Sequence, residues 1–423
     1  MKREFFESEI GESYVKVTLD SGLKVYILEK PRYNSAYAIF GTKYGSIDTC
    51  FSVDGNVSKV PEGIAHFLEH KLFESEDGDA FTKYAKTGAY ANAYTSFDRT
   101  CYLFSCSKMF YENLDILLNF VQSPYFTKET VEKEQGIIGQ EIRMYDDSPA
   151  WRVMFNMLLA MYKNHPVRID IAGTVESIAE IDYELLYRCY NTFYNPSNMF
   201  ICIAGNVDTE KVLAQIKAGI KESAPLNIER ITENEPESIV KPYVEQKSAV
   251  ATPMFCFGYK QTITTPERSI KEKVCMSLLL EIIAGDCSPL YKRLTDDGLI
   301  NDEFSFEYFI GHSYAAVIFE GESENPKAVA DAIKQEIDRI KQDGFDKKLF
   351  SAVRAGMYGS AIKAFDSVES IAMQMTDCAM SDLGLFDEIK YLKSVTYDDV
   401  LKEAFVLNND NTVLSVILPN KEN

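Results

Sequence analysis

Along the first half of the chain, the spacing of apolar residues switches between the two-residue period of strands and the longer period of helices. Residues 14–19 and 23–28 alternate apolar and polar side chains around Asp20-Ser21-Gly22, which predicts a β-hairpin. Similar patterns predict further strands at 36–44, 89–96, 100–106 and 199–205. Helical spacing predicts helices at 61–73, 80–86, 111–121, 128–145, 151–162 and 183–194. Together these elements predict an α+β fold.

The second half of the chain repeats the order of these elements. Residues 290–304 align with 80–94, and residues 344–360 align with 125–141, with glycines and apolar residues in matching places. Chance agreement between amphipathic helices is the alternative, but the shared order favours a duplication. We therefore predict two homologous α+β domains of about 200 residues, each a mostly antiparallel sheet packed against helices.

A polar segment separates the two repeats. Residues 231–248, ITENEPESIVKPYVEQKS, contain two prolines and show no helical period, which predicts a linker. Residues 1–230 would then form the first domain and residues 249–423 the second.

Composition and charge narrow the class of protein. Acidic residues outnumber basic ones 64 to 44, and the formal charge of −20 disfavours nucleic acid and anionic membranes as partners. The nine cysteines include no CxxC pair, the N-terminal segment lacks the apolar core of a signal peptide, and no apolar run reaches the length of a membrane span. We therefore expect a cytoplasmic protein with reduced thiols and no membrane span.

The chain contains four histidines, and two of them stand on one predicted helix, in Gly63-Ile64-Ala65-His66-Phe67-Leu68-Glu69-His70. Residues four apart share a helix face, so His66 and His70 can offer two imidazoles to one metal ion. Glu69 lies at the edge of that face, where it can reach a water molecule without being a ligand. The alternative is a buried helix with two hydrogen-bonded histidines and an exposed glutamate. The HxxEH spacing favours a metal site.

A third ligand is expected from the acidic helix predicted at 128–145, which offers Glu132, Glu134 and Glu141. Glu134 and Glu141 are seven residues apart and therefore share a face. Glu141 could be the ligand, and Glu134 could orient a histidine N–H from two turns earlier. Solvated carboxylates on an acidic helix are the alternative.

These motifs resemble those of the pitrilysin/insulinase family of zinc peptidases, the inverzincins, along nearly the whole chain. The matching stretches are PEGIAHFLEHKLFE, GAYANAYTSFDRTCYLF, VEKEQGIIGQEI, HPVRIDIAGTVESI and YNPSNMFICIAGNVD. The chain is most similar to bacterial members with two domains per chain, particularly cytoplasmic ones that pair an active chain with a degenerate partner. The resemblance implies that His66, His70 and Glu141 bind one zinc ion, that Glu69 is the general base, and that Glu134 orients a ligand.

The resemblance also implies how a substrate is held. Asn92-Ala93-Tyr94 matches the family strand to which a peptide adds as an extra β-strand. A plain edge strand is the alternative. In the family, the domains enclose a chamber that admits short or unfolded polypeptides and excludes folded proteins.

The second repeat has lost the metal ligands. Leu278, Ile282 and Ser360 stand where the three ligands stand in the first repeat, so we expect no second metal ion. In family members with a complete chamber, an Arg four residues before a Gly-Leu and a Tyr three after the Gly steady the substrate carbonyl. Around Gly298 these positions hold Leu294 and Asn301.

The missing pair affects the expected assembly. We expect a heterodimer with a second two-domain chain that lacks HxxEH and carries the Arg/Tyr pair, and a homodimer is the runner-up. The leading function is a zinc metallopeptidase that hydrolyses peptides. The alternative is a zinc-bearing subunit of a heterodimeric processing or binding assembly, with little activity on its own. Maturation of one specific peptide and general peptide turnover are both compatible with the sequence.

Overall fold

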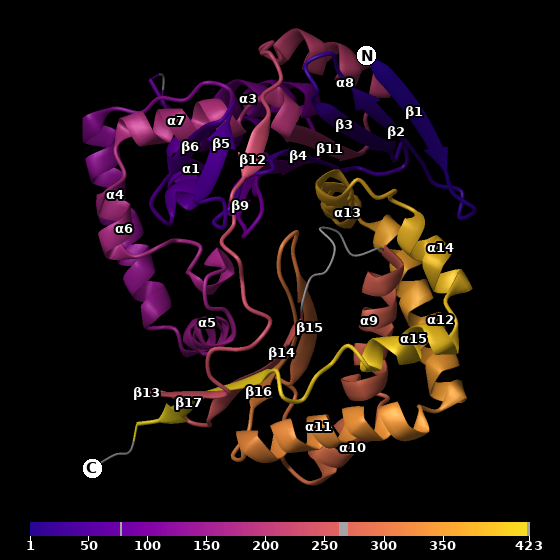
Figure 1. Ribbon diagram of the computed structural model, residues 1–423. Helices are drawn as coiled ribbons and strands as arrows, with labels where there is room; N and C mark the ends of the chain where they lie inside the picture. The colour runs from indigo at the N-terminus through magenta and orange to yellow at the C-terminus, as the bar shows by residue number, and fades with distance from the viewer. Residues whose placement is uncertain (77, 262–269, 421–423) are drawn as a thin grey trace. The chain divides into compact units, whose positions relative to one another are not determined.

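The protein folds into two compact units, each a β-sheet covered by helices (Figure 1). The computed structural model describes residues 1–76, 78–261 and 270–420. Residues 262–269 and 421–423, within the range predicted for the second domain, lie outside the described residues. Unit 1 comprises Met1–Ile142, Asp170–Thr232 and Ile362–Leu385, and unit 2 comprises Arg143–Ile169, Glu233–Ala361 and Phe386–Asn423.

Unit 1 is built on a seven-stranded sheet in the order β1-β2-β3-β11-β4-β10-β9. Neighbouring strands are antiparallel, except for the parallel pair β3 and β11. The central strands β4 and β11 are buried along their whole length, whereas β9 forms an edge of the sheet. The strands are β1 (Lys2–Glu7), β2 (Ser13–Thr18), β3 (Lys24–Glu29), β4 (Ala36–Thr42), β9 (Tyr90–Thr95), β10 (Thr100–Cys106) and β11 (Met199–Gly205).

Smaller strands and the helices complete unit 1. The predicted strands and helices of the first half are confirmed, with bounds that differ by a few residues at most. The smaller strands are β5 (Cys50–Val53), β6 (Asn56–Lys59), β7 (Glu74–Ser75), β8 (Gly78–Asp79) and β12 (Ile228–Arg230). The helices are α1 (Ile64–Leu72), α2 (Ala80–Thr87), α3 (Phe110–Val121), α4 (Lys128–Asp146), α6 (Val175–Ala179), α7 (Tyr183–Phe193), α8 (Thr209–Gly219) and α13 (Val368–Ser381), with the unit boundary inside α4.

Unit 2 repeats the strand order of unit 1. Its five-stranded sheet runs β13-β17-β14-β16-β15, which matches β3-β11-β4-β10-β9 strand for strand. Both series contain one parallel pair, formed by β13 with β17 and by β3 with β11. The strands are β13 (Tyr243–Ser248), β14 (Met254–Gln261), β15 (Ser305–Ile310), β16 (Ala315–Glu322) and β17 (Thr412–Pro419). Two homologous α+β repeats, as predicted, account for this correspondence.

The segment predicted as a linker is only partly a connection. Its last six residues form β13, the counterpart of β3. Alternate residues of β13 are exposed, because it is an edge strand that covers the core with one face only. A short strand with so many polar residues resembles a loop when its partner, β17, lies far away in the sequence.

The two halves of the chain exchange one helix each. Helix α5 (Pro149–Met161), from the first half, packs on β14 and β17 of unit 2. Helix α13, from the second half, packs on β4 and β11 of unit 1 (Figure 1). Gly258 of β14 lies against α5, where a Cβ would come 2.7 Å from the sulfur of the Met157 side chain. The compact units therefore do not coincide with the continuous ranges 1–230 and 249–423.

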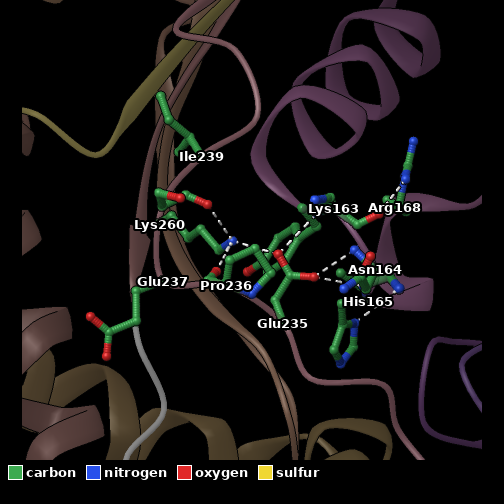
Figure 2. Close-up of polar contacts among 12 residues, drawn as sticks. Lys163, Asn164, His165, Arg168, Glu235, Pro236, Glu237, Ile239 and Lys260 are labelled. Carbon is green, nitrogen blue, oxygen red and sulfur yellow. Dashed lines mark hydrogen bonds and ion pairs between the residues drawn. The ribbon is translucent and has the colours of Figure 1, made fainter.

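Glu235 fixes the loop that follows α5 within unit 2 (Figure 2). The backbone amides of Lys163, Asn164 and His165 donate to its carboxylate at 2.9, 2.6 and 2.8 Å. The ammonium of Lys260, on β14, donates to the same carboxylate at 2.6 Å and to two nearby backbone carbonyls. One buried ion pair thus joins the end of α5, the start of the predicted linker and the second sheet.

The helices of unit 2 enclose a second hydrophobic core. Besides α5, they are α9 (Ile270–Ala284), α10 (Pro289–Asp296), α11 (Pro326–Asp343), α12 (Lys347–Lys363), α14 (Asp387–Ser394) and α15 (Tyr397–Ala404). By length and composition alone, Ile270–Asp296 could cross a membrane. Most of its apolar window is buried inside the fold, where α9 contributes to the core of unit 2. Core helices of soluble proteins share this property.

Candidate metal centre

Helix α1 places the HxxEH residues, and a glycine sets where it begins. Gly63 precedes the helix with a left-handed φ of 86°, and a Cβ there would lie 2.3 Å from the carbonyl oxygen of Ala172. Glycine is therefore required at this position. The helix then packs against β9 and β10 and buries Phe67 and Leu68 completely.

Helix α4 brings a third ligand to the two histidines. The Nε2 atom of His66 lies 3.7 Å from Oε1 of Glu141, and Nε2 of His70 lies 3.4 Å from Oε2 of the same carboxylate. The ligand atoms of the three residues lie within 4.8 Å of one another. Both nitrogen–oxygen distances exceed those of good hydrogen bonds, and the spacing suits an ion held between the three groups.

Glu134 lies next to His70, outside the cluster of His66, His70 and Glu141. Its Oε1 atom is 3.0 Å from Nδ1 of His70. If this nitrogen carries the proton, the lone pair of the other nitrogen, Nε2, faces Glu141, which is the tautomer needed for metal binding. The third acidic candidate, Glu132, pairs instead with Lys128 on the exposed side of α4, at 3.8 Å.

Burial and charge act differently on the two histidines. Burial, together with the neighbouring His70, lowers the pKa of His66 to about 3, so His66 is neutral near pH 7. Burial alone would also lower the pKa of His70, but the hydrogen bond to Glu134 and the charges of Glu69 and Glu141 outweigh it and raise that pKa. A metal ion must therefore displace a proton from His70 more often than from His66.

Glu69 stands beside the ligands without joining them, and Thr95 holds it. The hydroxyl of Thr95, the last residue of β9, donates to Oε2 of Glu69 at 2.6 Å. Burial raises the pKa of Glu69, while the hydroxyl and the backbone amide of Thr95 act in the opposite direction. Sequence reasoning missed Thr95. Its only signal was its place directly after Asn92-Ala93-Tyr94.

The free edge of β9 offers backbone groups next to Glu69. Residues of an antiparallel pair alternate between bonding to the partner strand and pointing away from it. The amide of Ser96 donates to the carbonyl of Arg99 at 2.8 Å across the β9–β10 turn. The backbone groups of Thr95 and of Ala93 therefore point to the free edge.

The three residues predicted to bind a substrate strand differ in the direction of their backbone groups. The amide of Ala93 points to the free edge and donates to the side-chain oxygen of Asn92 at 2.9 Å. The backbone groups of Asn92 and Tyr94 face β10, and their side chains lie on the opposite face from Thr95. A substrate role for these three residues stays a prediction.

The corresponding positions of the second repeat carry no metal ligands. Leu278 and Ile282 stand at the positions of the two histidines, and their aliphatic side chains are fully buried in the core of unit 2. Ser360 is exposed on α12. Within the part of the chain that the structure describes, the group formed by His66, His70 and Glu141 is the one that could hold a metal ion.

The donor atoms fit zinc. Two imidazole nitrogens and one carboxylate oxygen are a common ligand set of catalytic zinc sites, which keep a further coordination position open. The hydrogen bond from His70 to Glu134 is the outer support that such sites use. A half-buried carboxylate, that of Glu69, stands where it can exchange a proton with a water molecule in the site.

The chain is similar to known proteins in both sequence and structure. Residues 58–175 match the family model described as "Insulinase (Peptidase family M16)", and residues 180–357 match "Peptidase M16 inactive domain". The chain is 43% identical to the uncharacterized zinc protease YmfH of Bacillus subtilis, over 93% of each chain. A solved structure described as an M16-like peptidase, from Alicyclobacillus acidocaldarius, is 34% identical with a TM-score of 0.94, over 98% of this chain and 100% of that one. A protease from Helicobacter pylori shares the fold, with a TM-score of 0.82 at 19% identity, over 99% of this chain and 100% of its own.

Proposed function

The chain belongs to the insulinase family of peptidases, family M16, and from this membership we propose that it is a zinc-dependent endopeptidase. The observation that carries the proposal is the grouping of His66, His70 and Glu141, with Glu69 held beside them. A scaffold that only retained zinc would not need Glu69.

Each residue of the site has a distinct task in this reaction. His66, His70 and Glu141 hold the zinc ion, and Glu134 keeps His70 in the tautomer that binds it. When bound, zinc acidifies water and polarises a carbonyl group. Glu69 accepts a proton from the attacking water and delivers it to the nitrogen of the leaving amine.

The substrates we propose are short or unfolded peptides. An edge strand binds a partner through main-chain hydrogen bonds, which any extended peptide can supply. β9 is such an edge, and Ala93 offers its amide there once the side chain of Asn92 moves aside. Most strands of a folded protein already pair with neighbours on both sides, so short or unfolded peptides supply such a partner more readily than folded proteins do.

The assembly we propose is a heterodimer with a zinc-free chain of the same fold, and a homodimer is the runner-up. Two other residues, Leu294 and Asn301, occupy the positions of the Arg/Tyr pair, and both make contacts within unit 2. Leu294 is buried in its core, and the side chain of Asn301 donates to Glu322 at 2.9 Å. A cytoplasmic location is part of the proposal, and it is supported by the nine cysteines, among which the structure forms no disulfide bond.

The test is peptide hydrolysis followed by mass spectrometry. A tryptic digest of denatured casein is incubated with the purified chain, alone and with a zinc-free paralogue, in the presence and absence of a chelator. Cleavage that the chelator abolishes supports the proposal.

The Glu69→Gln variant should retain zinc and lose at least roughly a hundredfold in rate. Cleavage by this variant at the wild-type rate would exclude Glu69 as the base. Full activity of the chain alone would exclude the need for a heterodimer.

A further inference from the structure

We propose that Thr95 is a positioning residue for Glu69, which it holds with one carboxylate oxygen occupied and the other available for proton transfer. The inference rests on the proposed function, because it assigns a role within the same site. It concerns a residue outside the group of His66, His70 and Glu141. Its basis is the hydrogen bond of 2.6 Å from the Thr95 hydroxyl to Oε2 of Glu69.

The direction of this hydrogen bond is set by its surroundings. The hydroxyl of Thr100, opposite Thr95 on β10, lies 3.3 Å from that of Thr95. Thr100 is fully buried and donates its own proton to the backbone carbonyl of Tyr44 at 2.9 Å. The proton of Thr95 is therefore directed to the closer and charged acceptor, Glu69.

The backbone around Thr95 is held by the β9–β10 turn. Thr95 ends β9, and the following residue, Ser96, closes the turn to β10 through a hydrogen bond to Arg99. Thr95 is β-branched, so its χ1 angle has few alternatives and the hydroxyl direction follows the backbone. Glu69, in contrast, is a long side chain in the second half of α1 that would otherwise sample several rotamers.

Two consequences follow for the reaction. While Oε2 accepts the Thr95 proton, a proton taken from water goes to the other oxygen, Oε1. Thr95 also belongs to the strand that would bind the substrate, so the same strand positions both the base and the peptide. Geometric control of this kind changes the rate of the chemical step far more than it changes substrate binding.

The experiment compares three isosteric or near-isosteric variants of the full chain: Thr95→Val, Thr95→Ser and the control Thr100→Val. The first removes the hydroxyl that holds Glu69, the second retains it, and the third removes the adjacent hydroxyl on β10. Kinetics use a fluorogenic version of a peptide that the wild type cleaves in the casein digest. Zinc content is measured by atomic spectroscopy, and metal-free crystal structures of the wild type and all three variants show the position of the Glu69 carboxylate.

We expect Thr95→Val to lower kcat roughly 10- to 100-fold with KM nearly unchanged, since a hydrogen bond to a charged group is lost. Thr95→Ser should recover most of that loss, Thr100→Val should stay within about threefold of the wild type, and all should retain zinc. In the crystals, Glu69 should leave its observed position in Thr95→Val alone.

Two results would overturn the inference. One is a Thr95→Val enzyme with wild-type kcat. The other is a Thr95→Val crystal structure in which Glu69 keeps its place. If the wild type cleaves no peptide with or without a paralogue, the proposed function fails, and the position of Glu69 in the crystals still decides whether Thr95 holds it.

Discussion

Removing the carboxylate of Glu235 should destabilise unit 2 strongly. The Glu235→Ala change leaves three successive amides, those of Lys163, Asn164 and His165, without their acceptor. It also leaves the ammonium of Lys260, whose side chain is 3% exposed, without a counter-ion. Glu235 itself is 16% exposed, so water can reach some of the freed amides.

The pKa shifts of Glu235 and Lys260 indicate which of them depends more on the other for its charge. Burial raises the pKa of Glu235, but Lys260 and the three amides outweigh burial and hold that pKa below its usual value. Burial lowers the pKa of Lys260, and Glu235 opposes this only in part. The ammonium is thus the group that depends on its partner. Breaking a buried ion pair from one side costs about 3–5 kcal/mol, a large share of the roughly 5–15 kcal/mol that stabilises a typical domain.

A double-mutant cycle isolates this effect. Urea unfolding followed by circular dichroism gives the free energy of unfolding, and hydrogen exchange at the amides of residues 163–165 reports the local opening. We expect Glu235→Ala to lose about 3–5 kcal/mol. Glu235→Ala combined with Lys260→Met should be more stable than Glu235→Ala alone, because no unpaired charge remains buried. The exposed neighbour Glu237→Ala, drawn beside it in Figure 2, should change stability by less than about 0.5 kcal/mol. A loss below about 1 kcal/mol for Glu235→Ala, or a second mutation that only adds to the damage, would refute the reasoning.

Three further predictions concern the metal centre and His165. We expect one zinc ion per chain by metal analysis, lost in Glu141→Ala and unaffected in Glu132→Ala, whose side chain pairs with Lys128; two ions in a clean wild-type preparation would contradict this. Glu134→Ala should weaken zinc binding about 10- to 100-fold in a competition titration, because His70 loses the acceptor that fixes its tautomer, and unchanged affinity would remove that role. Burial lowers the pKa of His165 from 6.5 to about 4, so the unfolded chain binds a proton at His165 more readily than the folded protein does. The free energy of unfolding therefore has its full value above pH 6.5 and decreases as the pH falls towards 4. Unfolding measured at pH 8 and 5 should show a decrease about 2 kcal/mol smaller in His165→Asn than in the wild type, and equal decreases would contradict the assignment.

The sequence determined those features that depend on local spacing. The period of apolar residues located the strands and helices of the first half, because burial on one side of an element leaves a direct trace in the sequence. Two histidines four residues apart on a helix, and two glutamates seven apart on another, share a face whatever the surroundings. Spacing therefore predicted the two pairs, His66 with His70 and Glu134 with Glu141, whereas the meeting of the two helices at one site was implied only by the resemblance to the family.

Only the tertiary structure decided which elements pack together. An apolar helix face does not specify the sheet on which it packs, and α5 and α13 each pack on the sheet of the other half. β13 looked like a linker because its pairing with β17 spans most of the second half of the chain. Thr95 was missed for the same reason: its hydroxyl meets Glu69 across 26 residues, and no local period records a contact between a strand and a helix.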